Sequence, residues 1–347
     1  MSYTFEKDRL AKYLAEYIKG YLFVEFSDEF MKRLNIEDVA KGVRVPIDPR
    51  DLKRFSGGSG VSATEIAGNM VRVVGCDPNF KYANAYKKFM GRFFNERLPQ
   101  DVLMTGVKAV EAGNLQEACI HFRAALFLEP DMMEAMYNYA RVCREMYNSS
   151  DDEIFIGMCK AESTEAFEKL TEDYPDFDQS YFFLGYAYLN MGLYEKAGLA
   201  WEKFLPIAKD HQAAQEAAQR LREIAEPRRI EAGCNAVISG RYAEGIGILS
   251  GFAASGYETW WPLHFYLGVA YEEVGNMDAA EREYKRTLQL NAADMGSMEG
   301  LIRIYKGRGQ DELAEKYEKK KSIIEENLRA DAQERSENPE ANSDGEK

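Results

Sequence analysis

The stretch SYFFLGYAYLNMGLYEKAGLAWEKFL, from Ser180 to Leu205, decides the fold that we predict for this chain. Its bulky residues recur at helical spacing on both sides of Gly192, which indicates two helices joined by a tight turn. Small residues at Gly185 and Ala197 would let the two helices approach closely, while Trp201 fills the space beside them. Gly192 falls where the first helix ends, and a left-handed cap position there favours glycine. We therefore predict a helix–turn–helix unit.

The same unit recurs along the chain at a regular interval. The small-residue position of its first helix falls at Gly106, Ala140, Gly185, Gly233, Gly268 and, in degraded form, Ile302. Successive positions are 34, 45, 48, 35 and 34 residues apart, so insertions of 11 and 14 residues interrupt one period. Glycines also recur where the first helices should end, at Gly113, Gly192, Gly240, Gly275 and Gly309. One helix pair cannot bury its own apolar face, so the copies are expected to stack.

This pattern resembles the tetratricopeptide repeat (TPR), a helix–turn–helix unit of about 34 residues. Six linked matches cover residues 99–330, about two thirds of the chain. The resemblance implies an all-α fold, a TPR-type helical-repeat solenoid of about six helix pairs. It also implies a concave surface, lined by the first helices, on which peptides or folded protein segments bind.

The remaining segments divide the chain further. Residues 1–98 do not fit the repeat and are predicted to form a small, mostly helical N-terminal module. The TPR solenoid of residues 99–330 carries insertions near 147–157 and 210–223, and it is expected to bend into two blocks, roughly 99–209 and 226–330. The first insertion lengthens a helix or forms a loop, and the second has a strongly helical composition. Residues 331–347 are nearly free of apolar side chains and predict a disordered acidic tail.

The N-terminal module has three local patterns. An apolar stripe from Leu10 to Leu22 has helical spacing, and Phe80 to Phe93 contains a second amphipathic pattern. Between them, Gly42–Ile47 (GVRVPI) favours a short extended piece. We recognise no family in this region.

Composition and charge limit the function. The chain has 347 residues and a formal net charge of −14, which disfavours nucleic acid as the main ligand. Its five cysteines include no C-x-x-C pair, so we expect reduced, buried thiols. The N-terminus has no secretory signal pattern, and no apolar run reaches the roughly 20 residues needed to span a bilayer. We expect a cytoplasmic protein without a membrane partner.

The motifs that suggest catalysis have a plainer interpretation. Residues 58–63 (GSGVSA) match the G-x-G-x-x-A pattern of dinucleotide-binding loops, but no strand precedes them and no βαβ unit follows. A flexible loop that ends in a helix cap is the alternative that we favour. The three histidines (His121, His211 and His264) are far apart in sequence and belong to no metal-binding motif. We expect no enzymatic activity, no cofactor and no metal.

The groove residues follow from the resemblance, one repeat at a time. The family's inward positions correspond here to Leu103, Val107, Val110, Tyr137, Arg141, Arg144, Phe182, Tyr186, Leu189, Phe265, Val269 and Glu272. Some TPR domains clamp a partner's C-terminal carboxylate, but the apolar side chains of Leu103 and Val107 cannot bind an anion. We expect Phe182 and Tyr186 to be available to a partner, without bridging the helices of their own repeat. Alternatively, residues 1–98 or the long helices cover this surface.

Two functions remain open from the sequence. The first is a non-catalytic adaptor or scaffold that captures a protein segment in the concave groove. The second is a regulator in which the N-terminal module binds DNA and the array senses a peptide. The second function would need a helix-turn-helix within residues 1–98, and the sequence contains no convincing one.

Overall fold

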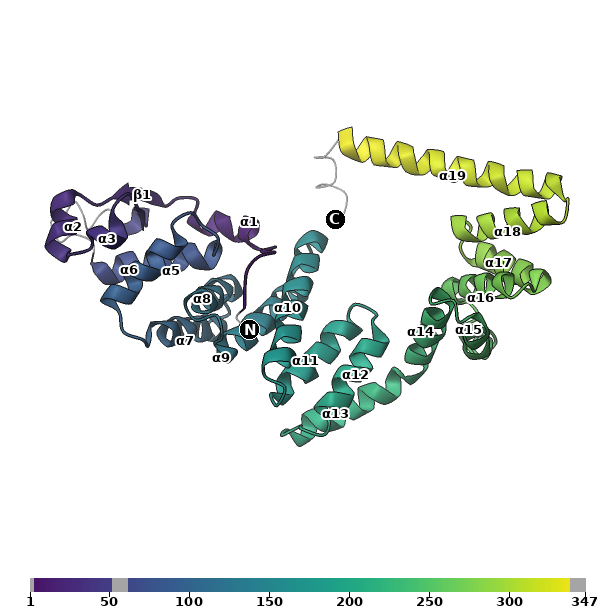
Figure 1. The fold of residues 1–347 in the computed structure, drawn as a ribbon, viewed down its shortest axis with the longest axis horizontal. Coiled ribbons are helices and arrows are strands. Elements are labelled where there is room, and N and C mark those ends of the chain that lie inside the picture. Colours follow the sequence, from purple (N-terminus) through teal and green to yellow (C-terminus); the bar gives the residue numbers. More distant parts are fainter. Residues whose placement is uncertain (1–2, 52–61, 338–347) are drawn as a thin grey trace. The chain divides into compact units, whose positions relative to one another are not determined.

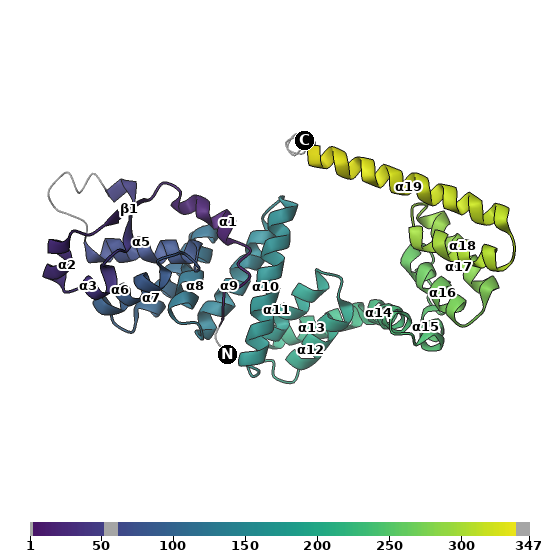
Figure 2. The same ribbon diagram turned by 45° about the horizontal axis from the view of Figure 1, so that its top comes forward.

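The computed structural model describes residues 3–51 and 62–337 and shows a helical-repeat array (Figure 1). Six helix pairs follow one another in chain order: α7 (Leu98–Glu111) with α8 (Leu115–Leu128), α9 (Met133–Asn148) with α10 (Glu153–Asp173), α11 (Asp178–Leu189) with α12 (Tyr194–Phe204), α14 (Ala225–Ile238) with α15 (Tyr242–Leu249), α16 (Trp261–Glu273) with α17 (Met277–Leu290), and α18 (Met295–Gly307) with α19 (Asp311–Glu337). The all-α repeat fold predicted from the sequence is confirmed. Figure 2 shows the same helix pairs after a 45° rotation.

Glycines set both the packing and the ends of the pairs. An added Cβ at Gly106 would lie 2.6 Å from the Phe122 ring, and one at Gly268 would lie 2.6 Å from the Tyr284 ring. Only a residue without a side chain lets the two helices of these pairs come so close. Each predicted glycine at the end of a first helix has a left-handed backbone: Gly113 (φ 76°), Gly192 (71°), Gly240 (77°), Gly275 (81°) and Gly309 (67°).

The two insertions are accommodated mainly as additional helix. The first extends α9 and α10, which have 16 and 21 residues where α7 and α8 have 14 each. The second forms a separate helix, α13 (His211–Glu223). At the C-terminal end, α19 continues to Glu337, whereas the sequence predicts disorder from residue 331. Residues 338–347 lie outside the described residues.

The chain divides into two compact units, Met1–Gln219 and Arg220–Lys347. The first unit holds the first three helix pairs, and the second holds the last three. All five cysteines are free and buried, as predicted from the sequence. Within the described residues, no helix is both long enough and apolar enough to cross a lipid bilayer.

The N-terminal region differs from its sequence prediction in one stretch. Among the described residues its elements are α1 (Ala11–Leu14), η1 (Ala15–Ile18), β1 (Leu22–Glu25), α2 (Asp28–Leu34), α3 (Glu37–Ala40), β2 (Arg44–Ile47), η2 (Pro49–Asp51), α5 (Ala63–Cys76) and α6 (Ala83–Phe93). The extended piece expected at 42–47 is β2, which pairs antiparallel with β1, with Leu22 opposite Ile47. The helical stripe from Leu10 to Leu22 therefore breaks at Ile18, because Leu22 begins a strand.

The first residues of the chain are held in the core of the first unit. Tyr3 donates its backbone N–H to the Pro130 carbonyl at 2.8 Å, and its ring packs edge-on against Tyr139. The fully buried Arg123 pairs with Asp8 at 2.5 Å and donates from Nε to the Gly75 carbonyl at 2.7 Å. A buried ion pair of this kind needs its remaining donors satisfied, and the backbone carbonyl of Gly75 does this.

A second polar contact extends this network to α10. The carboxylate of Glu162, itself buried, accepts from the Tyr139 hydroxyl at 2.7 Å and from Arg9 Nη1 at 2.9 Å. Residues 3–9 are thus tied to α8 and α10 by hydrogen bonds and ion pairs, and Tyr3 packs on Tyr139 of α9.

Candidate protein-binding groove

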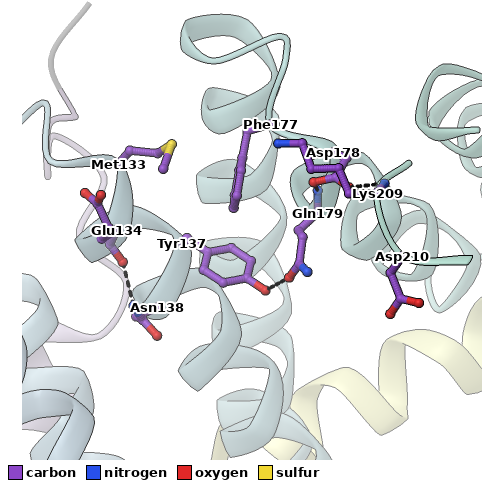
Figure 3. A pocket seen from close by; sticks show the side chains of 9 residues that line it. All are labelled: Met133, Glu134, Tyr137, Asn138, Phe177, Asp178, Gln179, Lys209 and Asp210. Atoms are coloured by element: carbon purple, nitrogen blue, oxygen red, sulfur yellow. Dashed lines mark hydrogen bonds between the residues drawn. The ribbon is translucent and has the colours of Figure 1, made fainter. Parts of the chain in front are cut away.

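A pocket of about 510 Å³ lies beside the N-terminal ends of α9 and α11 (Figure 3). Its wall is formed by Met133, Glu134, Tyr137, Asn138, Phe177, Asp178, Gln179, Lys209 and Asp210. Of these residues, the sequence predicted only Tyr137 as part of a groove. The apolar part comes from the side chains of Met133, Tyr137 and Phe177, and polar groups surround it.

Tyr137 is the centre of this pocket. Its ring meets Phe177 edge-on with centroids 5.1 Å apart, and its hydroxyl donates to Gln179 Oε1 (Figure 3). The guanidinium carbon of Arg141 lies 5.6 Å from the Tyr137 ring centroid. Burial raises the pKa of the Tyr137 hydroxyl, and the positive charge of Arg141 opposes that rise. The phenol is therefore neutral and held on three sides.

Two arginines of α9 lie over one ring of α11. The guanidinium carbons of Arg141 and Arg144 lie 5.6 Å and 5.5 Å from the centroid of Phe183, which is within cation–π range. Arg144 also pairs with Glu145 at 3.0 Å, and its Nε atom is buried without a hydrogen-bond partner in the described part of the chain. Arg141 is exposed. Among the described residues, no carboxylate forms an ion pair with it.

The aromatic groove candidates of α11, Phe182 and Tyr186, pack against the second helix of their own repeat. The ring of Phe182 packs on Phe204, and that of Tyr186 packs on Trp201, with 5.2 Å between centroids in both cases. The indole Nε1 of Trp201 donates to the backbone carbonyl of Phe182 at 3.1 Å. The expectation that Phe182 and Tyr186 do not bridge α11 and α12 is therefore wrong.

One candidate position also contacts the following helix. The Tyr186 hydroxyl donates to Glu216 of α13, so part of the alternative in which a long helix covers the groove is realised at this residue. Leu189, one turn further along α11, is half-buried.

The remaining candidates lie in well-packed surroundings. Leu103 of α7 is buried in the core of the first unit, and the half-buried Val107 packs against that core, while Val110 is exposed. In the second unit, the half-buried Phe265 lies against Gly296, where an added Cβ would be 2.7 Å from its ring. The half-buried Val269 packs there against Leu301 and its neighbours.

Glu272 is also held within the second unit. It accepts from Arg303 at 2.7 Å and 2.9 Å, and from the Tyr284 hydroxyl at 2.6 Å. Burial would raise the pKa of the Glu272 carboxyl group, but these hydrogen bonds outweigh it and lower the pKa.

The N-terminal module contacts the second-helix side of the array. Arg72 of α5 pairs with Glu117 of α8, and Lys87 of α6 donates to the Phe127 carbonyl at the end of α8. An added Cβ at Gly75 would meet Ile120 of α8, which shows how closely α5 lies on that helix. The pocket at Tyr137 is lined instead by α9 and α11, by Phe177 and by the residues just before α13.

Sequence reasoning missed the other residues of the pocket, among them Phe177, Gln179, Lys209 and Asp210. One signal could have found Phe177. Bulky residues occupy the position just before three first helices, at Met132, Phe177 and Trp260, and a recurrent position of this kind belongs to the repeat. Lys209 and Asp210 lie at the 14-residue insertion, where the repeat offers no register.

The residues that suggested nucleotide or metal binding have structural roles where the structure describes them. Gly58–Val61 lie outside the described residues, and Ser62 caps α5 in a capping box with Glu65. His264 is buried between Glu283 Oε2 at 2.7 Å and the Glu258 carbonyl at 3.0 Å. Within residues 3–51 and 62–337, no cluster of three histidine, cysteine or acidic side chains is arranged to hold a metal ion.

Comparison with known proteins identifies similar solved structures. No protein-family model and no curated protein sequence matches the chain. The TPR domain of P58(IPK) is 21% identical with a TM-score of 0.36, over 66% of this chain and 60% of that one. MamA from Desulfovibrio magneticus RS-1 is 14% identical with a TM-score of 0.32, over 54% and 96% of the two chains. TTC0263, a TPR protein of Thermus thermophilus, is 19% identical with a TM-score of 0.22, over 64% and 89%.

The repeat type follows from three features of the chain itself. The period, the glycine contacts with the facing ring and the left-handed glycines after the first helices occur together. The array is a helical-repeat solenoid of the TPR type.

Proposed function

We propose that this chain is a non-catalytic adaptor or scaffold that binds a segment of another protein along α9 and α11. The observation that carries the proposal is the pocket of about 510 Å³ in which Tyr137 is held between Phe177, Gln179 and Arg141. Rigid aromatic side chains surrounded by polar groups are the usual composition of an interface hot spot. The five buried thiols favour a reducing compartment such as the cytoplasm.

The proposed site is narrower than the groove expected from the sequence. It includes Tyr137, Arg141 and Arg144 but not Phe182 and Tyr186, because the rings of the latter two hold α11 against α12. It also leaves out the second unit, where Phe265 and Glu272 pack against their own neighbours. A partner that binds there can be displaced by changing the exposed Arg141, whereas Tyr137 itself also packs against Phe167 of α10 and Phe183 of α11.

Site-specific photo-crosslinking tests this proposal in a lysate of the source cell. A photoreactive residue placed at Asn138, in the pocket wall, should capture a protein, and the Gln179→Ala change should reduce that capture. The matched control is Leu199, an exposed residue of α12 away from the pocket. Equal labelling from Asn138 and Leu199, or labelling that Gln179→Ala leaves unchanged, would refute the proposed groove.

The alternative of a DNA-binding N-terminal module finds no support. A recognition helix has to present one face to the major groove. Most residues of α5 are instead buried, and on its other side Arg72 is engaged with Glu117. On α6, Tyr86 and Phe89 lie in the same core. Binding to random duplex DNA that weakens steeply with salt would revive this alternative.

A further inference from the structure

The exposed guanidinium of Arg141 can bind an anionic group of a partner. Its guanidinium carbon lies over the rings of Tyr137 and Phe183, 5.6 Å from each centroid. A guanidinium carries five N–H donors, so contact with these two rings leaves donors for an acceptor on a partner. Its charge acts on the phenol of Tyr137, and no described carboxylate pairs with it. A carboxylate supplies the acceptor geometry that a guanidinium favours.

The position of Arg141 relative to the pocket fixes a spacing. Tyr137 and Arg141 are four residues apart on α9, which corresponds to about 6 Å along the helix axis at about 1.5 Å per residue. An extended segment that runs along α9 advances about 3.3 Å per residue, so about two of its residues cover that distance. A side chain in the pocket and a side chain on Arg141 would therefore belong to residues i and i+2.

The charges around the pocket favour a single carboxylate over a polyanion. Glu134, Asp178 and Asp210 line the pocket together with one cation, Lys209. A nucleic acid or a strongly acidic tail would bring its other charges against these carboxylates, which is unfavourable. One acidic side chain on a mainly apolar segment meets Arg141 without this repulsion.

We propose that the groove selects an extended internal protein segment with an apolar side chain for the Tyr137 pocket and an aspartate or glutamate two residues away for Arg141. This inference rests on the proposed function and specifies the chemistry of its partner. Because Arg141 is exposed rather than enclosed, a bound chain can continue past it, and we therefore assign the carboxylate to a side chain.

A random peptide library displayed on phage, selected on the whole protein, tests the motif. Selected sequences should share an apolar residue and an acidic residue at positions i and i+2. They are then synthesised with an acetylated N-terminus and an amidated C-terminus. Replacing the acidic residue by its amide should weaken binding by about five- to tenfold, the usual effect of losing a charged hydrogen bond. Added NaCl should weaken the parent peptide more than its amide variant.

Arg141→Gln provides the decisive comparison. It should weaken the parent peptide by the same factor and leave the amide variant unchanged, which is the signature of a direct pair in a double-mutant cycle. Arg282→Gln, on the exposed face of α17, is the matched control and should change neither affinity. Charge reversal at Arg141 to glutamate should shift the selected residue from acidic to basic.

The possible failures are distinguishable. Peptides that require the pocket but bind equally with and without the carboxylate would overturn this inference and leave the proposed function standing. Binding that is lost on amidation of the C-terminus would assign Arg141 to a chain end and also overturn it. A dimer in light scattering that Arg141→Gln dissociates would make a second copy the occupant, again contradicting the inference. No peptide bound at the groove would count against both proposals.

Discussion

Gly185 of α11 lies against the indole of Trp201 in α12, and the Nε1 atom of that indole occupies the space where a side chain at residue 185 would begin. The fully buried Trp201 is fixed in this position because its Nε1 donates to the Phe182 carbonyl at 3.1 Å. The contact between these two residues therefore sets the distance between the helices of the third repeat. A methyl group at residue 185 has no room unless the indole or a helix moves.

The Gly185→Ala change should accordingly lower the free energy of unfolding by about 1–3 kcal/mol, the usual cost of overfilling a packed core. The matched control is Gly157→Ala on α10, where an added Cβ meets no atom within 4 Å. There the change should stabilise by about 0.5–1 kcal/mol, because alanine favours helix more than glycine does. Urea unfolding measures both, and equal effects of the two changes would contradict the packing account.

The groove aromatics should separate into stabilising and binding residues. The double change Phe182→Ala with Tyr186→Ala removes ring contacts with Phe204 and Trp201 and should cost about 2 kcal/mol or more of stability. Arg141→Gln should leave the unfolding midpoint nearly unchanged, since the side chain is exposed. Thermal unfolding measures this difference. A double variant as stable as the wild type would restore these two residues as free partner contacts.

The ion pair of Arg123 and Asp8 predicts a large effect from one substitution. Arg123→Ala leaves the carboxylate of Asp8 buried without its partner and should destabilise the first unit by about 3–5 kcal/mol. Because the pair holds residues 3–9 in place, the same change should expose that segment to proteolysis. Limited proteolysis followed by mass spectrometry checks this. Resistance equal to that of the wild type would show that the pair contributes little to holding the segment.

The thiols should be unreactive in the folded chain. Burial raises the pKa of Cys76, Cys159 and Cys234 to about 12, so at pH 8 these groups remain protonated and lack the nucleophilic thiolate. Burial raises the pKa of Cys143 as well. Ellman's reagent should react slowly with the native protein and with all five cysteines after unfolding in guanidinium. Rapid reaction of a native thiol would show that the first or the second unit opens locally.

The stability of the second unit should fall in acid through Glu281. Burial would raise the pKa of this carboxyl group, but hydrogen bonds from Lys285, Tyr305 and Arg308 outweigh it and lower the pKa to about 2. The ordinary value in an unfolded chain is about 4.3. The folded state thus holds the proton less tightly, so this stabilisation is present above about pH 4.3 and is lost as the pH falls toward 2.

The Glu281→Gln variant measures that contribution. Its difference in stability from the wild type should be constant at neutral pH and shrink between about pH 4.3 and 2. In a Trp201→Phe background the fluorescence of Trp260 and Trp261 reports on the second unit. A difference that persists unchanged to the acid limit would contradict the assigned hydrogen bonds.

The repeat could be predicted from the sequence because each structural requirement of the unit selects one residue type, and that residue type recurs at a fixed interval. A left-handed turn leaves glycine at Gly113 and Gly275, and close helix contact leaves glycine at Gly185 and Gly268. The N-terminal region leaves no such period. Nothing in the sequence around Leu22 shows that its partner is β2, so the local pattern predicts a continued helix where the chain forms a strand.

The candidate site could be predicted only in part for a related reason. Family positions identified Tyr137 and Arg141 as inward-facing, but they do not tell whether an inward ring is free. Phe182 has the same register as Tyr137 and Tyr186 has that of Arg141, yet the rings of Phe182 and Tyr186 pack on Phe204 and Trp201. That difference depends on side chains of the second helix, which vary from one repeat to the next.

The contacts of residues 3–9 have a consequence for the order of assembly. Asp8 and Arg123 are 115 residues apart in sequence, and Arg9 and Glu162 are 153 apart. In the second unit, by contrast, Glu272 reaches its partner Arg303 across 31 residues. Contacts between distant residues form slowly, because a long loop has to close first. On a ribosome, the second unit can therefore assemble pair by pair, whereas the beginning of the chain waits for α10 before it reaches its final place.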